Sequence, residues 1–241
     1  MIKHILLSTI AIAMLVACNQ TQSTKQETKE KSEIEHEWKV IFDGKTFDGW
    51  HVYMADSSSD QWSIEDGAMF FNPKEGRTEA GQNLMTNKEY KNFKLSLEWK
   101  IVKGGNSGIF WGVKEDAKYK EAYETGPEIQ VLDNINYADT IRNHQAGALY
   151  DMVEPSQEVV KRAGEWNKCI ISIDHRLNEG KVWLNEVLIV EFSVHGNGWD
   201  TLVAKSKFKG WEGFGKFTTG KIGLQDHGDK VWYRNIKIKE L

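Results

Sequence analysis

The chain has 241 residues, with 31 Lys and Arg against 35 Asp and Glu, and a formal net charge of −4 at pH 7. Because nucleic-acid-binding domains carry a basic excess, this balance predicts no nucleic-acid partner. The chain has only two cysteines, Cys18 and Cys169. A disulfide-dense secreted scaffold is therefore excluded as well.

The amino terminus has the pattern of a signal peptide over residues 1–17. A basic start at Lys3 precedes an apolar run over residues 5–16, which is too short for a spanning helix. The run ends in Leu15-Val16-Ala17-Cys18, which resembles a bacterial lipoprotein lipobox and implies cleavage before Cys18 and acylation of its thiol. A signal peptide without lipidation is the alternative. We expect a lipid-anchored protein of the bacterial cell envelope, either periplasmic or on the cell surface.

A polar segment follows over residues 18–37, rich in Lys, Glu, Ser and Thr, and it predicts a disordered tether. Loss of residues 1–17 removes one lysine, so 30 basic and 35 acidic residues remain and the mature net charge is −5. The remaining residues, 38–241, are enough for one large domain. Cys169 is the only cysteine of residues 38–241 and lies in a strand-like run, so we expect its thiol to be buried and inert.

The domain shows period-two alternation and glycine-rich turns, with almost no helical period. Residues 93–101 are the clearest case, because apolar and polar side chains alternate over nine positions. Asp66-Gly67 predicts a hairpin turn, and Asn185-Glu186 a tight turn without the usual glycine. The expected strands are residues 38–42, 61–65, 68–71, 93–101, 109–113, 128–132, 166–174, 181–184, 187–192, 220–228 and 231–239. This pattern predicts an all-β sandwich or barrel.

The stretch over residues 125–133 places charged and amide groups inside an otherwise buried strand. Side chains alternate along a strand, so Glu128 and Gln130 share one face while Ile129 and Val131 share the other. One face is expected to be core and the other either a functional surface or an ordinary solvated strand face.

Two long connections, residues 134–164 and 195–219, exceed the usual length of loops in a compact domain, so we expect them to form the walls of a site. The first contains Arg142, His144, Tyr150 and Asp151, and the second His195, Trp199, Lys205, Lys207 and Trp211.

Several short blocks in register resemble one family. They are residues 42–50, 106–109, 126–133, 147–150, 164–167, 224–228 and 234–236. Together they are similar to the bacterial 3-keto-disaccharide hydrolases, also described as 3-keto-glucoside 1,2-lyases and 3-keto-2-hydroxy-glucal hydratases. The resemblance implies a concanavalin A-like jelly roll of two antiparallel sheets. It also implies cleavage of 3-keto-glucosides by elimination and hydration, with net hydrolysis. The turn Asn185-Glu186 departs from the more usual Asn-Gly.

The implied chemistry needs a base for the acidic C2 proton, an acid for the leaving oxygen, and help for the enolate. The expected catalytic residues are Glu128, His144, Asp226 and His227, and the expected substrate-binding residues are Gln130, Arg234, Trp111, Tyr150 and Lys205. For each tryptophan, core packing is the alternative. Strand parity places Arg234 on an inward face, where a buried salt bridge competes with a ligand. Asp226 and His227 are consecutive, so they face opposite ways unless the turn at Gly228 intervenes.

No cofactor is required by the sequence, although Glu128, His144, Asp226 and His227 offer ligand types for a divalent metal without a diagnostic spacing. One alternative is a laminarinase-type retaining glycosidase, but Asp133 has the opposite parity to Glu128. A non-catalytic carbohydrate-binding module is the other. The expected partners are a carbohydrate and the lipid at Cys18, and no pattern specifies an oligomeric state.

Overall fold

The computed structural model describes residues 37–56, 59–74 and 82–241. The signal peptide, Cys18 and most of the tether lie outside the described residues. Glu37–Leu241 form one compact unit. None of its described helices combines the length and apolarity that crossing a membrane requires.

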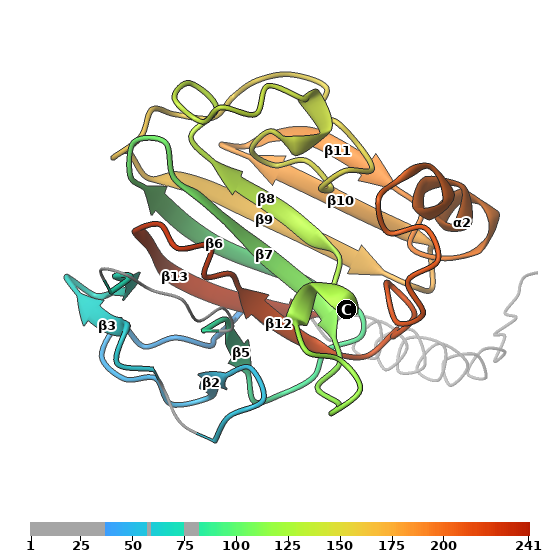
Figure 1. Cartoon of the computed structure of the whole chain (residues 1–241). Helices are drawn as coiled ribbons and strands as arrows, with labels where there is room; N and C mark the ends of the chain where they lie inside the picture. Colours follow the sequence, from blue (N-terminus) through green and yellow to red (C-terminus); the bar gives the residue numbers. More distant parts are fainter. Residues whose placement is uncertain (1–36, 57–58, 75–81) are drawn as a thin grey trace, which may run out of the picture. The chain divides into compact units, whose positions relative to one another are not determined.

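The larger sheet has eight antiparallel strands in the order β11-β10-β9-β6-β13-β4-β3, with β1 pairing to β13 beside that path. Strands β11, β10, β9, β6, β13 and β3 of this sheet are labelled in Figure 1. Its strands are β1 (Lys39–Val40), β3 (Trp62–Glu65), β4 (Ala68–Phe71), β6 (Phe93–Ile101), β9 (Asn167–Asp174), β10 (Glu179–Leu184), β11 (Val187–Phe192) and β13 (Val231–Glu240). The strand expected at residues 93–101 is confirmed as β6 over the same residues.

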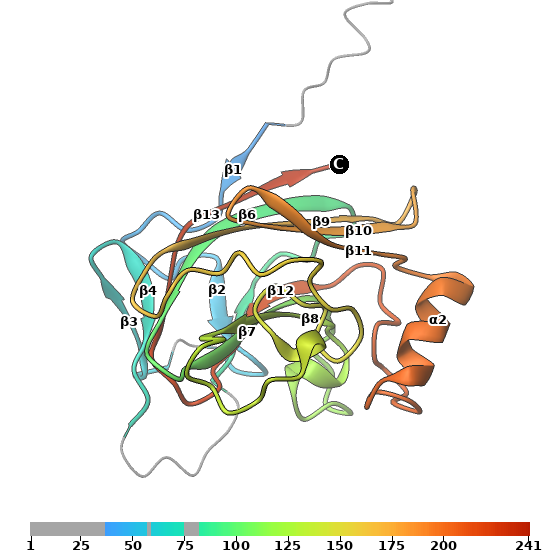
Figure 2. The ribbon, with the colours of Figure 1, turned by 90° about the horizontal axis from the view of Figure 1, so that it is seen from above.

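The smaller sheet has five antiparallel strands in the order β2-β5-β12-β7-β8. Its strands are β2 (Trp50–Val52), β5 (Leu84–Thr86), β12 (Lys221–Leu224), β7 (Asn106–Val113) and β8 (Glu128–Leu132). The two sheets lie face to face as two layers (Figure 2). The predicted sandwich of two antiparallel sheets is therefore confirmed.

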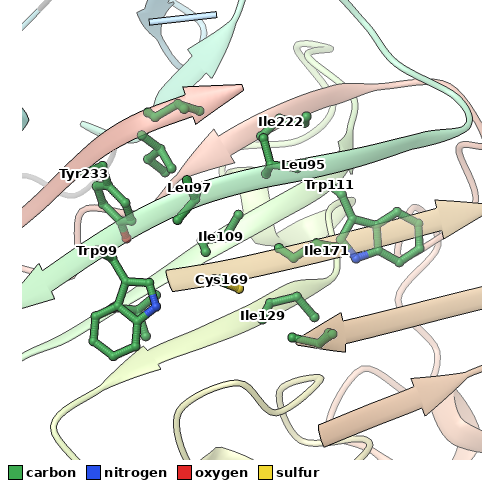
Figure 3. Packing of buried hydrophobic residues seen from close by; sticks show 14 of the residues in the cluster. Leu95, Leu97, Trp99, Ile109, Trp111, Ile129, Cys169, Ile171, Ile222 and Tyr233 are labelled. Atoms are coloured by element: carbon green, nitrogen blue, oxygen red, sulfur yellow. The ribbon is translucent and has the colours of Figure 1, made fainter. Parts of the chain in front are cut away.

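The core fills the space between the sheets, and one face of each strand supplies it. Leu95, Leu97 and Trp99 of β6 are each 1% exposed, and they meet Ile109 and Ile129 of the smaller sheet (Figure 3). Cys169 is also buried there, and burial raises the pKa of its thiol to about 12, as expected of an inert cysteine. Since Ile129 and Val131 face this core, the opposite face of β8 points away from the larger sheet.

Two predicted hairpin turns are confirmed by their backbone angles. Asp66 and Gly67 have φ of 49° and 74°, and Asn185 and Glu186 have φ of 49° and 74°. Both central residues of such a turn need positive φ, which Glu186 adopts without being glycine. The Asn185 side chain holds its turn, because it accepts the Lys168 N–H at 3.0 Å and donates to the Val159 carbonyl at 2.8 Å.

Several elements differ from those expected. The short strands β2 and β5 lie in stretches where no strand was predicted, and β1 covers only two residues of the predicted 38–42. The connection over residues 195–219 contains a helix, α2 (Gly196–Lys205). Two 3-10 turns, η1 (Ala122–Glu124) and η2 (Arg142–His144), occur in other connections.

Candidate active site

A cavity of about 350 Å³ lies on the face of the smaller sheet that points away from the core. Its walls come from β7, β8, η1, the end of β12 and both long connections. The lining residues are Asn106, Tyr123, Glu128, Gln130, Tyr150, Lys207, Phe208, Trp211, Gln225 and His227. Its volume is typical of a small-molecule site. The two long connections therefore form walls of the cavity, as predicted.

The connection after β8 folds back along the free edge of that strand. Tyr150 donates its N–H to the Glu128 carbonyl at 3.0 Å, and Gly147 donates to the Gln130 carbonyl at 2.8 Å. Gln130 in turn donates to the Ala148 carbonyl at 3.1 Å. This pairing covers the sheet edge and directs Tyr150 into the cavity lined by Glu128.

Glu128 is the only carboxylate among the described residues that line the cavity, and it is 8% exposed. Burial raises the pKa of its carboxyl to about 8, although Lys207 and the Gln225 side chain oppose the shift. The Gln225 contact is long, with 3.4 Å from Nε2 to Oε2. Glu128 therefore exchanges its proton close to neutral pH, which suits a general acid or base.

Three amide side chains line the same cavity as this carboxyl. Asn106, Gln130 and Gln225 are between 3% and 9% exposed. Their side-chain oxygens have no hydrogen-bond partner among the described residues. Because buried polar atoms are normally satisfied, three orphaned acceptors around one cavity indicate a ligand with several hydroxyl donors.

A chain of polar contacts joins the two long connections behind the cavity. His144 contacts Asp139 through Nδ1 at 2.5 Å and Asp151 through Nε2 at 2.9 Å. Asp151 also accepts the N–H of Lys207 at 2.6 Å. Burial works against a charge on His144, but the hydrogen bonds to Asp139 and Asp151 outweigh it and raise its pKa. Through Asp151, His144 thus holds the segment that presents Lys207.

Lys207 places its charge on the aromatic wall of the cavity. Its Nζ lies 4.2 Å from the ring centroid of Tyr150 and 5.3 Å from that of Phe208. The Phe208 ring is itself stacked on Phe214 at 3.8 Å and packed against Trp211 at 5.2 Å. Burial and the charge of Glu128 raise the pKa of Tyr150 to about 12, so its hydroxyl stays protonated at neutral pH.

The sequence pattern of the family described as the 3-keto-alpha-glucoside-1,2-lyase-like domain matches residues 37–239. The chain belongs to this family. A 3-keto-disaccharide hydrolase of Bacteroides thetaiotaomicron is 39% identical over 229 residues, which covers 84% of this chain and 78% of the relative. The protein is thus an enzyme of a glycoside-cleaving family.

Solved structures agree with this family membership. A Parabacteroides distasonis protein provisionally described as a glycosyl hydrolase is 32% identical, with a TM-score of 0.79 over 88% of this chain and 96% of that chain. A second such protein from the same organism is 28% identical, with a TM-score of 0.66 over 85% and 100% of the two chains. A galectin-like protein of Bacillus subtilis is 11% identical with a TM-score of 0.54 over 82% and 93% of the two chains, and it shows the shared sandwich fold.

In this family member, Arg234 does not lie at the cavity. Asn235 has φ of 53° and forms a bulge in β13, across which the register to β6 shifts between Arg234 and Lys237. Because an extra residue reverses parity, Arg234 lies on the outer face of the larger sheet rather than inward as predicted. There it pairs with Glu98 at 2.8 Å and stacks on Trp166 at 3.9 Å. The structural salt bridge weighed as the alternative is thus present.

Trp111 and Lys205 are corrected as well. Trp111 is 3% exposed and packs in the core near Trp199 at 6.0 Å, so it cannot stack on a ligand in the cavity. Lys205 ends α2 on the exposed surface, and Lys207 lines the cavity in its place. The unpredicted helix α2 ends at Lys205, so the segment that follows it, which includes Lys207, reaches the cavity.

Asp226 and His227 diverge, as their alternating parity predicted. His227 lines the cavity. Asp226 turns toward the start of β5, where it accepts the N–H of Gln82 while its own N–H bonds Asn83 at 3.0 Å. His144 lies behind the Tyr150 ring, with the centroids 4.6 Å apart, rather than in the lining. Of the four expected catalytic residues, Glu128 and His227 therefore meet at the cavity.

The candidate metal ligands are the same four residues. Over residues 37–56, 59–74 and 82–241, no three His, Cys, Asp or Glu side chains form a group that could hold a metal ion. Both nitrogens of His144 already contact carboxylates, and Asp226 points elsewhere. The four candidate ligands do not converge.

Sequence reasoning missed several lining residues, namely Asn106, Tyr123, Phe208 and Gln225. Asn106 and Gln225 lie within the blocks that carry the family resemblance, and that signal could have identified them. Phe208 and Tyr123 carry no local signal, because an aromatic residue in a connection is equally compatible with the core.

Proposed function

We propose that the enzyme cleaves 3-keto-disaccharides, and that it does so by elimination followed by hydration. The observation that carries the proposal is the buried carboxyl of Glu128, whose pKa is about 8, beside Lys207 and three amide oxygens that have no partner within the described part of the chain. The activity named for the Bacteroides thetaiotaomicron relative supports the substrate class.

A 3-keto group makes the hydrogen on C2 acidic. Removal of that proton places negative charge on the keto oxygen, and the charge is released as the glycosidic oxygen leaves C1. The C1–C2 double bond that results then takes up water, with oxygen bonding to C1 and a proton returning to C2. The site must therefore exchange a proton at C2 and stabilise an enolate.

The lining residues supply groups of the required types. The Glu128 carboxylate removes the C2 proton and returns it on hydration, because its pKa is close to the working pH. The ammonium of Lys207, held over Tyr150, stabilises the charge on the keto oxygen. His227, at the cavity wall, donates a proton to the leaving oxygen. The amides of Asn106, Gln130 and Gln225 bind sugar hydroxyls.

A retaining glycosidase requires a second carboxylate about 5 Å from the first. The candidate, Asp133, is committed to the β7 turn, where it accepts the Gly104 N–H at 2.7 Å and the Ile135 N–H at 3.2 Å. This commitment favours elimination over double displacement. A non-catalytic module would not need a buried carboxyl with a raised pKa.

The test is to incubate the purified domain with a 3-keto-glucoside and the matching unoxidised glucoside. We expect only the 3-keto form to be cleaved. Deuterium at C2 should slow the reaction or be lost to solvent, because elimination breaks the C2–H bond. Equal cleavage of both glucosides, with the label retained, would contradict the proposal.

The location is a separate proposal. We propose that Cys18 is acylated and that it anchors the enzyme in the cell envelope, as the lipobox-like ending of the signal peptide indicates. Cys18→Ser should abolish labelling with a fatty-acid analogue and release the enzyme from the membrane fraction. Unchanged labelling and fractionation would overturn it.

A further inference from the structure

A second cavity, of about 430 Å³, adjoins the first. Its lining is Lys118, Tyr119, Tyr123, Glu124, Trp211, Glu212 and Gly213. Tyr123 and Trp211 also line the cavity that holds Glu128, so these two rings form the boundary between the cavities. We call this pair the aromatic ridge. A ligand longer than one sugar ring can therefore pass over the ridge from one cavity to the other.

The ridge is held rigidly from the protein side. The rings of Tyr123 and Trp211 are 6.0 Å apart at 45°, and Phe208 packs against Trp211 at 5.2 Å. Tyr123 is nevertheless 40% exposed, although a solvent-facing aromatic ring gains little from folding. An exposed ring on a fixed support is a suitable platform for the apolar face of a sugar.

The position of the ridge is tied to that of the reactive carboxyl. Tyr123 lies in η1, five residues before Glu128, and two backbone hydrogen bonds hold the segment between them. Gly126 donates its N–H to the Ala122 carbonyl at 2.9 Å, and Gly215 donates to the Thr125 carbonyl at 2.9 Å. The first bond joins the backbone beside Tyr123 to the segment that leads into Glu128, and the second joins that segment to the connection over residues 195–219.

The far side of the second cavity combines an aromatic wall with an ion pair. Lys118 pairs with Glu212 at its rim. A Cβ at Gly213 would lie 2.6 Å from the Tyr119 ring, so glycine allows that ring to rest on the backbone. Hydroxyl-rich ligands suit such a wall, because ring faces and charged rim groups offer stacking and hydrogen bonds together.

From this geometry we infer that the second cavity is the subsite for the leaving group, that it binds the second sugar unit of a disaccharide, and that Tyr123 is its stacking platform. The inference rests on the proposed function, since it assumes that the 3-keto ring occupies the cavity with Glu128. The glycosidic oxygen that links the two sugars then lies over the aromatic ridge. Tyr123 is consequently a specificity-determining residue for the size of the leaving group.

The test compares a 3-keto-disaccharide with the 3-keto methyl glucoside, which has no second sugar. Tyr123→Ala should lower kcat/KM for the disaccharide about tenfold more than it lowers kcat/KM for the methyl glucoside. Tyr123→Phe retains the ring and should keep most of the disaccharide activity. Leu177→Ala, at a side chain 70% exposed in the β9–β10 turn, is the matched surface control.

The free sugar released from the disaccharide provides a second measurement. It should inhibit the wild-type enzyme competitively, and it should inhibit Tyr123→Ala about tenfold more weakly. Equal losses on both substrates, or unchanged inhibition, would overturn the subsite. If the wild type cleaves neither 3-keto substrate, the proposed function fails instead.

Discussion

A Cβ atom on Gly108 would lie 2.0 Å from Oε1 of Glu128, so the carboxyl of Glu128 occupies the space that any other residue at position 108 would fill. Gly108 lies on β7 next to β8, opposite Gln130 in the register. The glycine of the Asn-Ser-Gly block is therefore needed for close approach, since its φ is not in the left-handed region.

Gly108→Ala should displace Glu128 while leaving the fold intact, because the first atoms contacted belong to the end of a flexible side chain. We expect kcat/KM on a 3-keto-disaccharide to fall by about 10², as expected when a reactive group is misplaced by about 1 Å. Gly198→Ala is the control, because its new methyl group meets only the side chain of Ser193. If Gly108→Ala had full activity, the close contact would have no functional importance.

Glu128→Gln keeps the shape of the side chain but removes its proton exchange. Loss of a general base costs about 10² to 10⁴ in rate, and we expect kcat to fall within that range while KM changes little. Steady-state kinetics on the 3-keto-disaccharide measures both. Normal turnover by this variant would assign the proton transfer to another group.

The same substitution should change how stability depends on pH. The pKa of Glu128 rises from its ordinary 4.5 to about 8 in the folded protein. Between these values the folded state keeps a proton that the unfolded state has lost, so the free energy of unfolding decreases as pH rises toward 8. Glu128→Gln should remove this decrease. The free energy of unfolding of the variant should exceed that of the wild type by up to about 5 kcal/mol above pH 8, and the difference should vanish below pH 4.5.

Chemical denaturation at pH 4.5, 6.5 and 8.5 measures this difference. A constant offset between Glu128→Gln and wild type across the three pH values would show that the pKa of Glu128 is not raised. Glu191→Gln, at an exposed position of β11, is a suitable carboxylate control.

Lys207→Ala and Lys205→Ala form a matched pair two residues apart. Lys207 lines the cavity and lowers the pKa of Glu128, whereas Lys205 lies at the exposed end of α2. We expect Lys207→Ala to reduce kcat/KM by about 10² and to move the ionisation of Glu128 in the pH profile to higher pH. Lys205→Ala should leave both unchanged. Equal effects of the two variants would contradict the assigned site.

Strand identity was predictable because it is a local property. The alternation over residues 93–101 and the turn pairs at Asp66 and Asn185 depend only on neighbours in the chain, and the structure reproduces them. The separation of Glu128 and Gln130 from Ile129 and Val131 has the same origin. Helix α2 was missed although Trp199, Leu202 and Val203 follow a helical spacing, because three positions are a weak periodic signal.

The face on which Arg234 lies was not predictable from parity. The one extra residue at Asn235 reverses the alternation, and only the pairing of β13 with β6 reveals it. The role of Trp111 was likewise not predictable, because the local sequence does not distinguish a core tryptophan from one that binds a ligand. The packing of the two sheets places Trp111 in the core.

The sequence by itself determined an all-β sandwich or barrel and the polar face of β8, because these follow from local periodicity. The two-sheet arrangement followed from the blocks that resemble the family. The tertiary structure alone decided that Glu128 and His227 meet at the cavity while His144, Asp226 and Arg234 do not. It also decided the pKa of Glu128, because burial raises that pKa and the segments that exclude water from the carboxyl are distant in the sequence. Those segments are β7, β12 and the two long connections, and their convergence is a property of the fold.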